Sequence, residues 1–130
     1  MSASRIPLIA PDDLKKPGYE PAQHLQKQVD VRGLEAELRR CVHGEVRFDA
    51  GSRGMYAVDA SNYRQVPIAV VIPKSLEDVI RTVAACRRFG APVLSRGGGT
   101  SVAGQCCNVA VVIDWSKYLH NIVELNPGEK

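Results

Sequence analysis

The chain has 130 residues, 45% hydrophobic and 24% charged, which is the composition of one soluble globular domain. Its net charge of +3 is too small, and its basic residues are too scattered, to indicate nucleic acid as a partner. No run approaches the roughly 18 apolar residues of a membrane span. The first ten residues lack the apolar core of a signal peptide. We therefore expect a cytoplasmic protein.

The N-terminal third predicts a leader followed by one helix. Residues 1–30 carry four prolines and no apolar periodicity, which predicts an extended or disordered leader. Val31–Val42 shows helical spacing, with Asp30 as the N-cap and Gly44 as a stop signal. The predicted apolar face of this helix consists of Leu34, Leu38, Cys41 and Val42. For Glu45–Pro67 we expect a long connection of loops and turns with one short helical turn.

The middle of the chain predicts a compact β-α-β unit. Ile68–Ile72 is a continuous apolar run, typical of a strand covered on both faces. A helix follows between the N-cap Ser75 and the terminating Gly90, and then a short strand at Val93–Ser95. Such units place their strands parallel, with a right-handed crossover. The predicted apolar stripe of this helix is Leu76, Val79, Ile80, Val83 and Ala84.

Two further strands are predicted near the C-terminus, at Val109–Asp114 and at Asn121–Leu125, before the turn signal Asn126-Pro127-Gly128. The fold class is therefore α+β, with a small parallel or mixed sheet of about four short strands and two main helices. The last strand has no hairpin partner after the turn. It would leave an open sheet edge, and open edges favour pairing with another chain.

The four cysteines indicate no metal or disulfide framework. Cys41, Cys86, Cys106 and Cys107 form no C-x-x-C pair, and no histidine lies at zinc-ligand spacing from them. We expect reduced, partly buried thiols. The three histidines are far apart in sequence, so we assign no catalytic residue and no metal ligand.

A glycine-rich loop is the most informative part of the sequence. It reads Arg96-Gly97-Gly98-Gly99-Thr100-Ser101-Val102-Ala103-Gly104-Gln105. Glycines allow positive φ and close approach of a ligand, so that successive N–H groups can meet one anion. The hydroxyls of Thr100 and Ser101 add donors, and Arg96 either adds charge or pairs within the fold.

Better-known glycine motifs fit this loop poorly. It has no P-loop lysine, and Val102 stands where the third glycine of a dinucleotide-binding fingerprint belongs. The residues alone indicate an anion-binding loop and leave open a merely flexible turn between two strands.

Residues 67–130 resemble the start of the FAD-binding domain of the vanillyl-alcohol oxidase / PCMH superfamily. The resemblance rests on Ala69–Pro73, the Ser75–Gly90 helix, Ala91–Ser95 and Arg96–Gly104 in that order. Within the superfamily, the chain is most similar to FAD-linked oxidases of the glycolate oxidase / D-lactate dehydrogenase type. The stretches Phe48–Arg53 and Asp59–Arg64 resemble the lead-in of long members that also carry iron–sulfur modules.

The resemblance implies roles for individual residues. Backbone amides of Arg96–Gly104 would hold the FAD diphosphate, helped by Thr100, Ser101 and the adjoining Gln105, and Pro92 would lie near the adenine. Covalent members attach their flavin through a histidine at the position that Thr100 occupies here, so FAD is expected to bind non-covalently.

The resemblance also implies a partial domain. Residues 31–130 would form the N-terminal portion of an incomplete FAD-binding domain, the first half of the PCMH-type fold. The full-length protein would oxidise a small 2-hydroxy acid such as glycolate or D-lactate, with an iron–sulfur cluster in a C-terminal part, and this portion alone would be inactive. The alternative is a non-enzymatic α+β module that binds nucleotides or proteins and self-associates through its open sheet edge.

Overall fold

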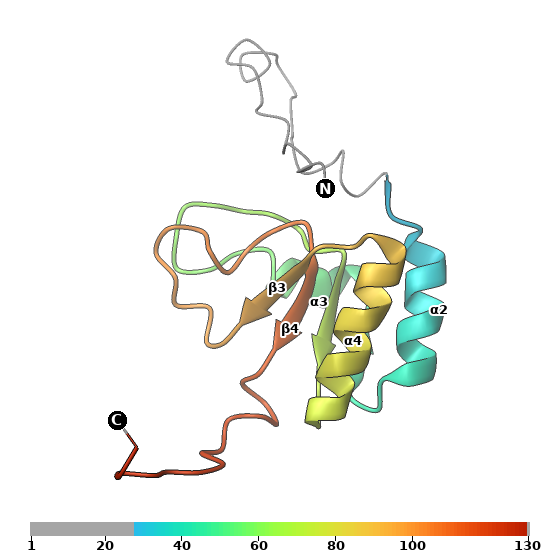
Figure 1. The fold of residues 1–130 in the computed structure, drawn as a ribbon. Helices are drawn as coiled ribbons and strands as arrows, with labels where there is room; N and C mark the ends of the chain where they lie inside the picture. Colours follow the sequence, from blue (N-terminus) through green and yellow to red (C-terminus); the bar gives the residue numbers. More distant parts are fainter. Residues whose placement is uncertain (1–27, 130) are drawn as a thin grey trace, which may run out of the picture.

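The computed structural model describes residues 28–129, so the leader predicted for residues 1–30 lies outside the described residues up to residue 27. The fold is α+β, as the sequence predicts (Figure 1). In chain order its elements are α2 (Val31–Cys41), β1 (Glu45–Arg47), α3 (Ala50–Met55), β2 (Ala69–Ile72), α4 (Leu76–Phe89), β3 (Val93–Arg96) and β4 (Val111–Asp114).

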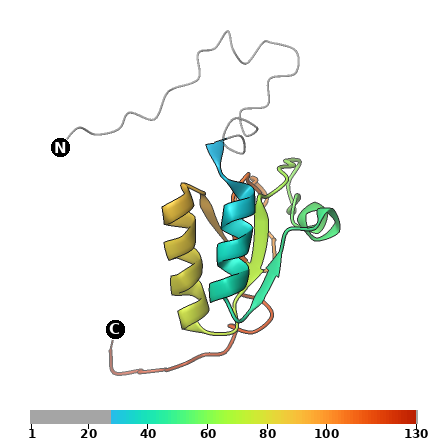
Figure 2. The ribbon, with the colours of Figure 1, turned by 90° about the vertical axis from the view of Figure 1, so that its right-hand side faces the viewer.

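The sheet is mixed, with the order β1-β2-β4-β3. β4 lies between β2 and β3 and is parallel to both, whereas β1 pairs antiparallel with β2. The two central strands are buried along their whole length, which confirms the expectation drawn from their continuous apolar runs. Helices α2 and α4 lie side by side against one face of the sheet, and α3 lies on the other side (Figure 2).

Helix α4 forms where predicted, but it buries a different face. Ser75 caps its N-terminus by accepting a bond from the Asp78 amide, and Gly90 ends it at φ +66°. The predicted stripe is wrong, because three of its members, Leu76, Ile80 and Val83, are exposed. The helix instead buries Asp78, Thr82, Ala85 and Cys86 against the sheet and α2.

The polar members of this buried face are fully hydrogen-bonded. The carboxylate of Asp78 accepts bonds from the amides of His43 and Lys74 at 2.8 and 3.0 Å. The Thr82 hydroxyl donates to the Asp78 carbonyl at 2.7 Å. These hydrogen bonds offset the free-energy cost of burying polar groups. A face that contains Asp78 and Thr82 can therefore be buried, although a prediction from apolar residues alone selects another face of α4.

Two expectations about the strands are wrong: one predicted strand does not form, and one strand forms that was not predicted. Asn121–Leu125 forms no strand, and its apolar residues Ile122, Val123 and Leu125 are at least 80% exposed. β1 occupies part of the segment expected to be only loop and helical turn; the turn itself is confirmed as α3. The edge strands are therefore β1 and β3, and β4, the last strand in the described chain, is central. The orphan strand on which the self-association alternative rested is absent from residues 28–129.

β1 is held at the edge of the sheet by side chains around Glu45. The carboxylate of Glu45 accepts hydrogen bonds from Lys117 at 2.5 Å, from Tyr118 at 2.8 Å and from Arg47. Hydrogen bonds from Lys117, Arg47 and Tyr118 together lower the pKa of Glu45 to about 2. The cluster thereby ties β1 to the segment that follows β4.

We predict that Glu45→Gln reduces the loss of folding stability that occurs as the pH falls from 4.5 towards 2. Because the pKa of Glu45 is lower in the folded state, its ionisation stabilises the fold above its ordinary pKa of 4.5, and this contribution is lost as the pH falls towards about 2. Urea unfolding at a series of pH values measures the effect. An unchanged slope of stability against pH between 4.5 and 2 would contradict this role of Glu45.

Candidate functional site

The glycine loop is the connection between two neighbouring parallel strands, β3 and β4. It leaves the end of β3 at Arg96 and returns to the start of β4, lying beside the segment 57–65 (orange and green at the left of Figure 1). Gly99 and Gly104 have φ of +69° and +79°, conformations that side chains rarely adopt. The predicted need for glycine is thus confirmed at two positions.

Six consecutive amides of this loop have no partner within the described part of the chain. The hydrogen bonds among residues 28–129 include no acceptor for the N–H groups of Gly97, Gly98, Gly99, Thr100, Ser101 and Val102. Gly97, Gly98 and Thr100 are also exposed to solvent. Amides of this kind are donors available to an external anion.

The second half of the loop is held together internally. The Ser101 hydroxyl accepts bonds from the amides of Ala103 and Gln105 at 3.4 and 3.1 Å, and it also contacts the Gln105 side chain. Thr100 makes no side-chain hydrogen bond to the described residues, so its hydroxyl is available to a ligand. Val102 is 80% exposed.

Arg96 makes contacts within the fold that hold the loop together. Its Nη1 donates to the Cys106 carbonyl at 2.8 Å, which joins the two ends of the loop. Its guanidinium carbon lies 5.2 Å from the centre of the Tyr56 ring, a cation–π distance. Of the two roles predicted for Arg96, the structure shows the pairing within the fold.

Tyr56 and Asp114 anchor these contacts to the sheet. The Tyr56 hydroxyl donates to Asp114 at 2.5 Å. Burial, and next the bond to Asp114, raises the pKa of Tyr56 to about 12, so the hydroxyl remains a donor at neutral pH. Burial opposes ionisation of Asp114, but hydrogen bonds from Ser116 and Tyr56 outweigh it and lower the pKa of this carboxyl. Asp114 at the end of β4 therefore fixes the position of Tyr56, and Arg96 lies over the Tyr56 ring.

Pro92 precedes β3, at the far end of the strand from Arg96. It is half-buried, and its carbonyl accepts a bond from the Val111 amide at 2.8 Å. Pro92 therefore helps to set the register of β3 against β4, and the glycine loop begins at the opposite end of that pairing.

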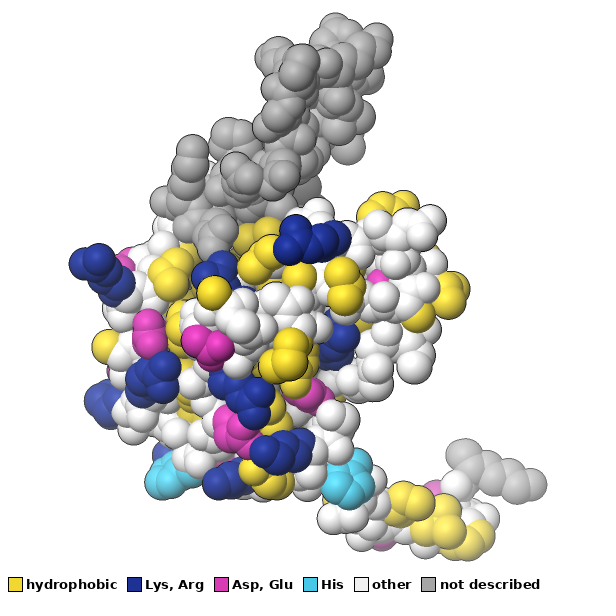
Figure 3. Space-filling model, turned by 180° about the vertical axis from the view of Figure 1, so that it is seen from behind, with side chains coloured by type: hydrophobic (Ala, Val, Ile, Leu, Met, Phe, Trp, Pro, Cys, Tyr) yellow, Lys and Arg dark blue, Asp and Glu magenta, His cyan; other side chains and the backbone are white. Residues whose placement is uncertain are grey.

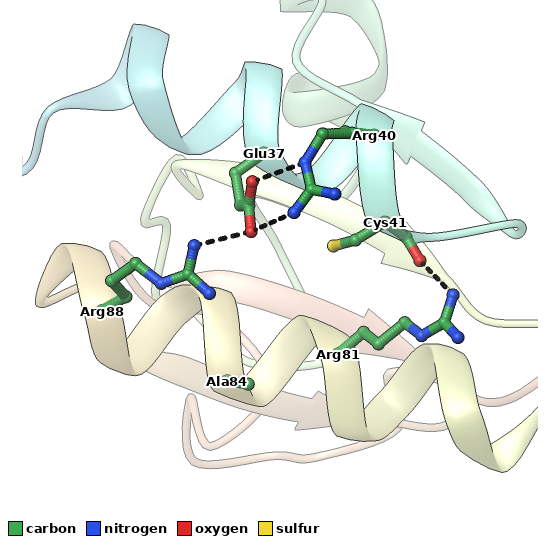
Figure 4. A pocket seen from close by; sticks show the side chains of 6 residues that line it. All are labelled: Glu37, Arg40, Cys41, Arg81, Ala84 and Arg88. Carbon is green, nitrogen blue, oxygen red and sulfur yellow. Dashed lines mark hydrogen bonds and ion pairs between the residues drawn. The ribbon is translucent and has the colours of Figure 1, made fainter.

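A hollow lies between α2 and α4 (Figure 4). Glu37 accepts bonds there from Arg40 and Arg88 at 2.9 and 2.7 Å, and Arg81 donates to the Cys41 carbonyl at 3.1 Å. These bonds join the two helices across the hollow. In Figure 3, basic and acidic side chains are likewise interspersed on the visible face.

Other kinds of site are not found in residues 28–129. No group of three or more potential metal-ligating side chains occurs in this range. No helix in it is long and apolar enough to cross a bilayer. All four cysteines are free, with Cys86 and Cys107 buried.

Comparison with known proteins decides which family the site belongs to. Residues 67–130, which include the glycine loop, match the family model described as FAD binding domain. Residues 67–130 belong to this FAD-binding domain family. The resemblance stated from the motifs is thereby confirmed.

The curated relatives of this chain include dehydrogenases and an oxidase that are named after 2-hydroxy acids. D-2-hydroxyglutarate dehydrogenase of Escherichia coli is 36% identical over 66% of the chain and 9% of its own length. The mitochondrial D-lactate dehydrogenase (cytochrome) of Kluyveromyces lactis is 29% identical over 96% of the chain and 23% of its own length. The glycolate oxidase subunit GlcD of Bacillus subtilis is 28% identical over 65% of the chain and 19% of its own length. The chain thus spans 9% to 23% of the length of these relatives.

A solved structure of p-cresol methylhydroxylase has the same fold in this region. It superposes with a TM-score of 0.56 at 16% identity, over 75% of the chain and 20% of that protein. The chain therefore has the fold of the first part of a PCMH-type FAD-binding domain.

We predict that two glycines of the loop differ sharply in tolerance to alanine. At Gly104, a Cβ would lie 2.7 Å from the Tyr63 ring at a φ of +79°, so Gly104→Ala should destabilise the fold by at least about 1 kcal/mol. At Gly97, no atom lies within 4 Å of the added Cβ and φ is not positive, so Gly97→Ala should be near neutral. Urea unfolding of both variants checks the difference, and equal stabilities would contradict this loop conformation.

Proposed function

We propose that the loop Arg96–Gln105 binds the diphosphate of FAD through the backbone amides of Gly97–Ser101. The family match over residues 67–130 supports the cofactor, and the amides without acceptors support the place. Two phosphate groups carry negative charge and many acceptor oxygens, which suits a row of exposed N–H donors. The hydroxyl of Thr100 adds one side-chain donor within this row.

The neighbouring residues would then have supporting roles. Arg96 keeps the two ends of the loop together, and Ser101 with Gln105 gives its second half a fixed shape. Pro92, which we place near the adenine, fixes the strand from which the loop departs. Val102, Ala103 and Gly104 complete the loop, and Gly104 supplies its second turn at positive φ.

The full-length protein is, by this proposal, an FAD-linked oxidoreductase acting on a small 2-hydroxy acid such as D-lactate, glycolate or D-2-hydroxyglutarate. The names of its relatives support that substrate class. FAD, when bound, accepts the two electrons removed from the hydroxyl-bearing carbon, whereas the residues described here bind and position the cofactor. An iron–sulfur cluster in a C-terminal part and a cytoplasmic location remain predictions from the sequence.

We propose that the FAD is attached non-covalently, because of the residue at the centre of the loop. Thr100 stands where covalent members of the superfamily have histidine, and a threonine hydroxyl does not form that flavin bond. Acid precipitation of the full-length protein should therefore release all its flavin into the supernatant.

We predict that Thr100→Asp weakens FAD binding to the full-length protein about tenfold or more, equivalent to about 1.4 kcal/mol, because a carboxylate would face the diphosphate. The control is Thr100→Asn, which has nearly the same shape without the charge. Flavin fluorescence titration measures both affinities. High salt should reduce the difference in FAD affinity between the two variants, because salt screens the charge of the aspartate. Equal affinities of the two variants at low salt would refute the placement of the diphosphate.

A further inference from the structure

We infer that Asp59, with Tyr63, is a positioning residue for the FAD diphosphate and holds the glycine loop in its binding shape before the cofactor arrives. This inference rests on the proposed function and adds a second segment to it, residues 57–65, which we call the support segment. The family match covers residues 67–130, so the support segment lies outside it.

The support segment is itself a closed, ordered turn. The Gln65 amide donates to the Ala57 carbonyl at 2.8 Å, and Val58 forms an antiparallel bridge with Arg64. Ala57 at its base is fully buried. The segment therefore starts and ends at one fixed place beside the sheet, and its tip can act as a rigid contact surface.

Asp59 joins this segment to the C-terminal end of the glycine loop. One carboxylate oxygen accepts bonds from the amide and hydroxyl of Ser61 at 2.9 and 2.5 Å. The other accepts a bond from the Cys106 amide at 3.2 Å. Hydrogen bonding from Ser61 and, more weakly, from Cys106 lowers the pKa of Asp59, so the group is a carboxylate at neutral pH. A charged acceptor shared by two segments makes a strong bridge between them.

Two further contacts hold the middle and the end of the loop. The Ala60 amide donates to the Gly99 carbonyl at 3.1 Å. The Tyr63 ring lies directly against Gly104, since a Cβ there would come within 2.7 Å of it. The support segment thus contacts both residues of the loop that adopt positive φ, Gly99 and Gly104.

The contacts matter because glycine chains lose much conformational entropy when they become ordered. A loop ordered in advance binds its ligand without that cost at the moment of binding. The bond from Ala60 occupies the Gly99 carbonyl, while the amides of Gly97–Ser101 remain available. The support segment therefore holds the loop through the Gly99 carbonyl and the Cys106 amide, and it leaves the amides of Gly97–Ser101 for the diphosphate.

The test is Asp59→Asn in the full-length protein. The asparagine side chain has one acceptor oxygen where aspartate has two, so either Ser61 or Cys106 loses its hydrogen bond to residue 59. We expect FAD affinity to fall about tenfold and hydrogen exchange of amides 97–106 to rise in the FAD-free protein. The matched control is Asp30→Asn, because Asp30 also accepts a backbone amide bond, from Gly33, but lies at α2 away from the loop.

Tyr63→Ala provides a second, independent variant should Asp59→Asn fail to fold, because the Tyr63 side chain is 61% exposed. It should also weaken FAD binding and increase exchange near Gly104. A purely structural role would lower the thermal midpoint while leaving the FAD affinity of the folded fraction unchanged, and that result would overturn the inference. Wild-type protein that binds no FAD would instead refute the proposed function itself.

Discussion

The site depends on the parallel pairing of β3 with β4. Neighbouring parallel strands cannot be joined by a tight turn, because the chain must travel back the length of the strand before it re-enters the sheet. Most such connections contain a helix, whereas here the chain returns through residues 97–110 without one. The return path therefore has a run of backbone whose N–H groups are not satisfied by a helix, and glycines let that run turn twice at positive φ.

The burial of β2 and β4 makes that pairing secure. Both strands are covered on each face, by α2 and α4 on one side and by Tyr56, Leu94 and Tyr118 on the other. The same Tyr56 carries Arg96 on its ring and donates to Asp114 at the end of β4. Core packing and loop shape are therefore connected through one side chain, which places the open amides at a defined position beside the sheet.

The sequence predicted those features that are determined locally. Ser75 and Gly90 delimit α4 because capping is a matter of a few neighbouring residues, and the solid apolar runs mark the two buried strands. Prediction from the sequence was wrong where the structure depends on residues far apart in the chain.

The buried face of α4 includes Asp78 because the amides of His43 and Lys74 donate hydrogen bonds to its carboxylate there. β1 is only three residues long and is held by Glu45 with Lys117, 72 positions away. Asp59 carried no recognisable signal of its role, since its partner Cys106 is 47 positions distant.

The proposed function requires that the amides of Gly97–Ser101 contact the FAD diphosphate. A crystal structure of the full-length protein with FAD tests this most directly. We expect several of these amide nitrogens at about 3 Å from diphosphate oxygens, with the support segment still bonded to Gly99 and Cys106. A structure in which the loop lies on the outer surface, away from the nucleotide, would contradict it.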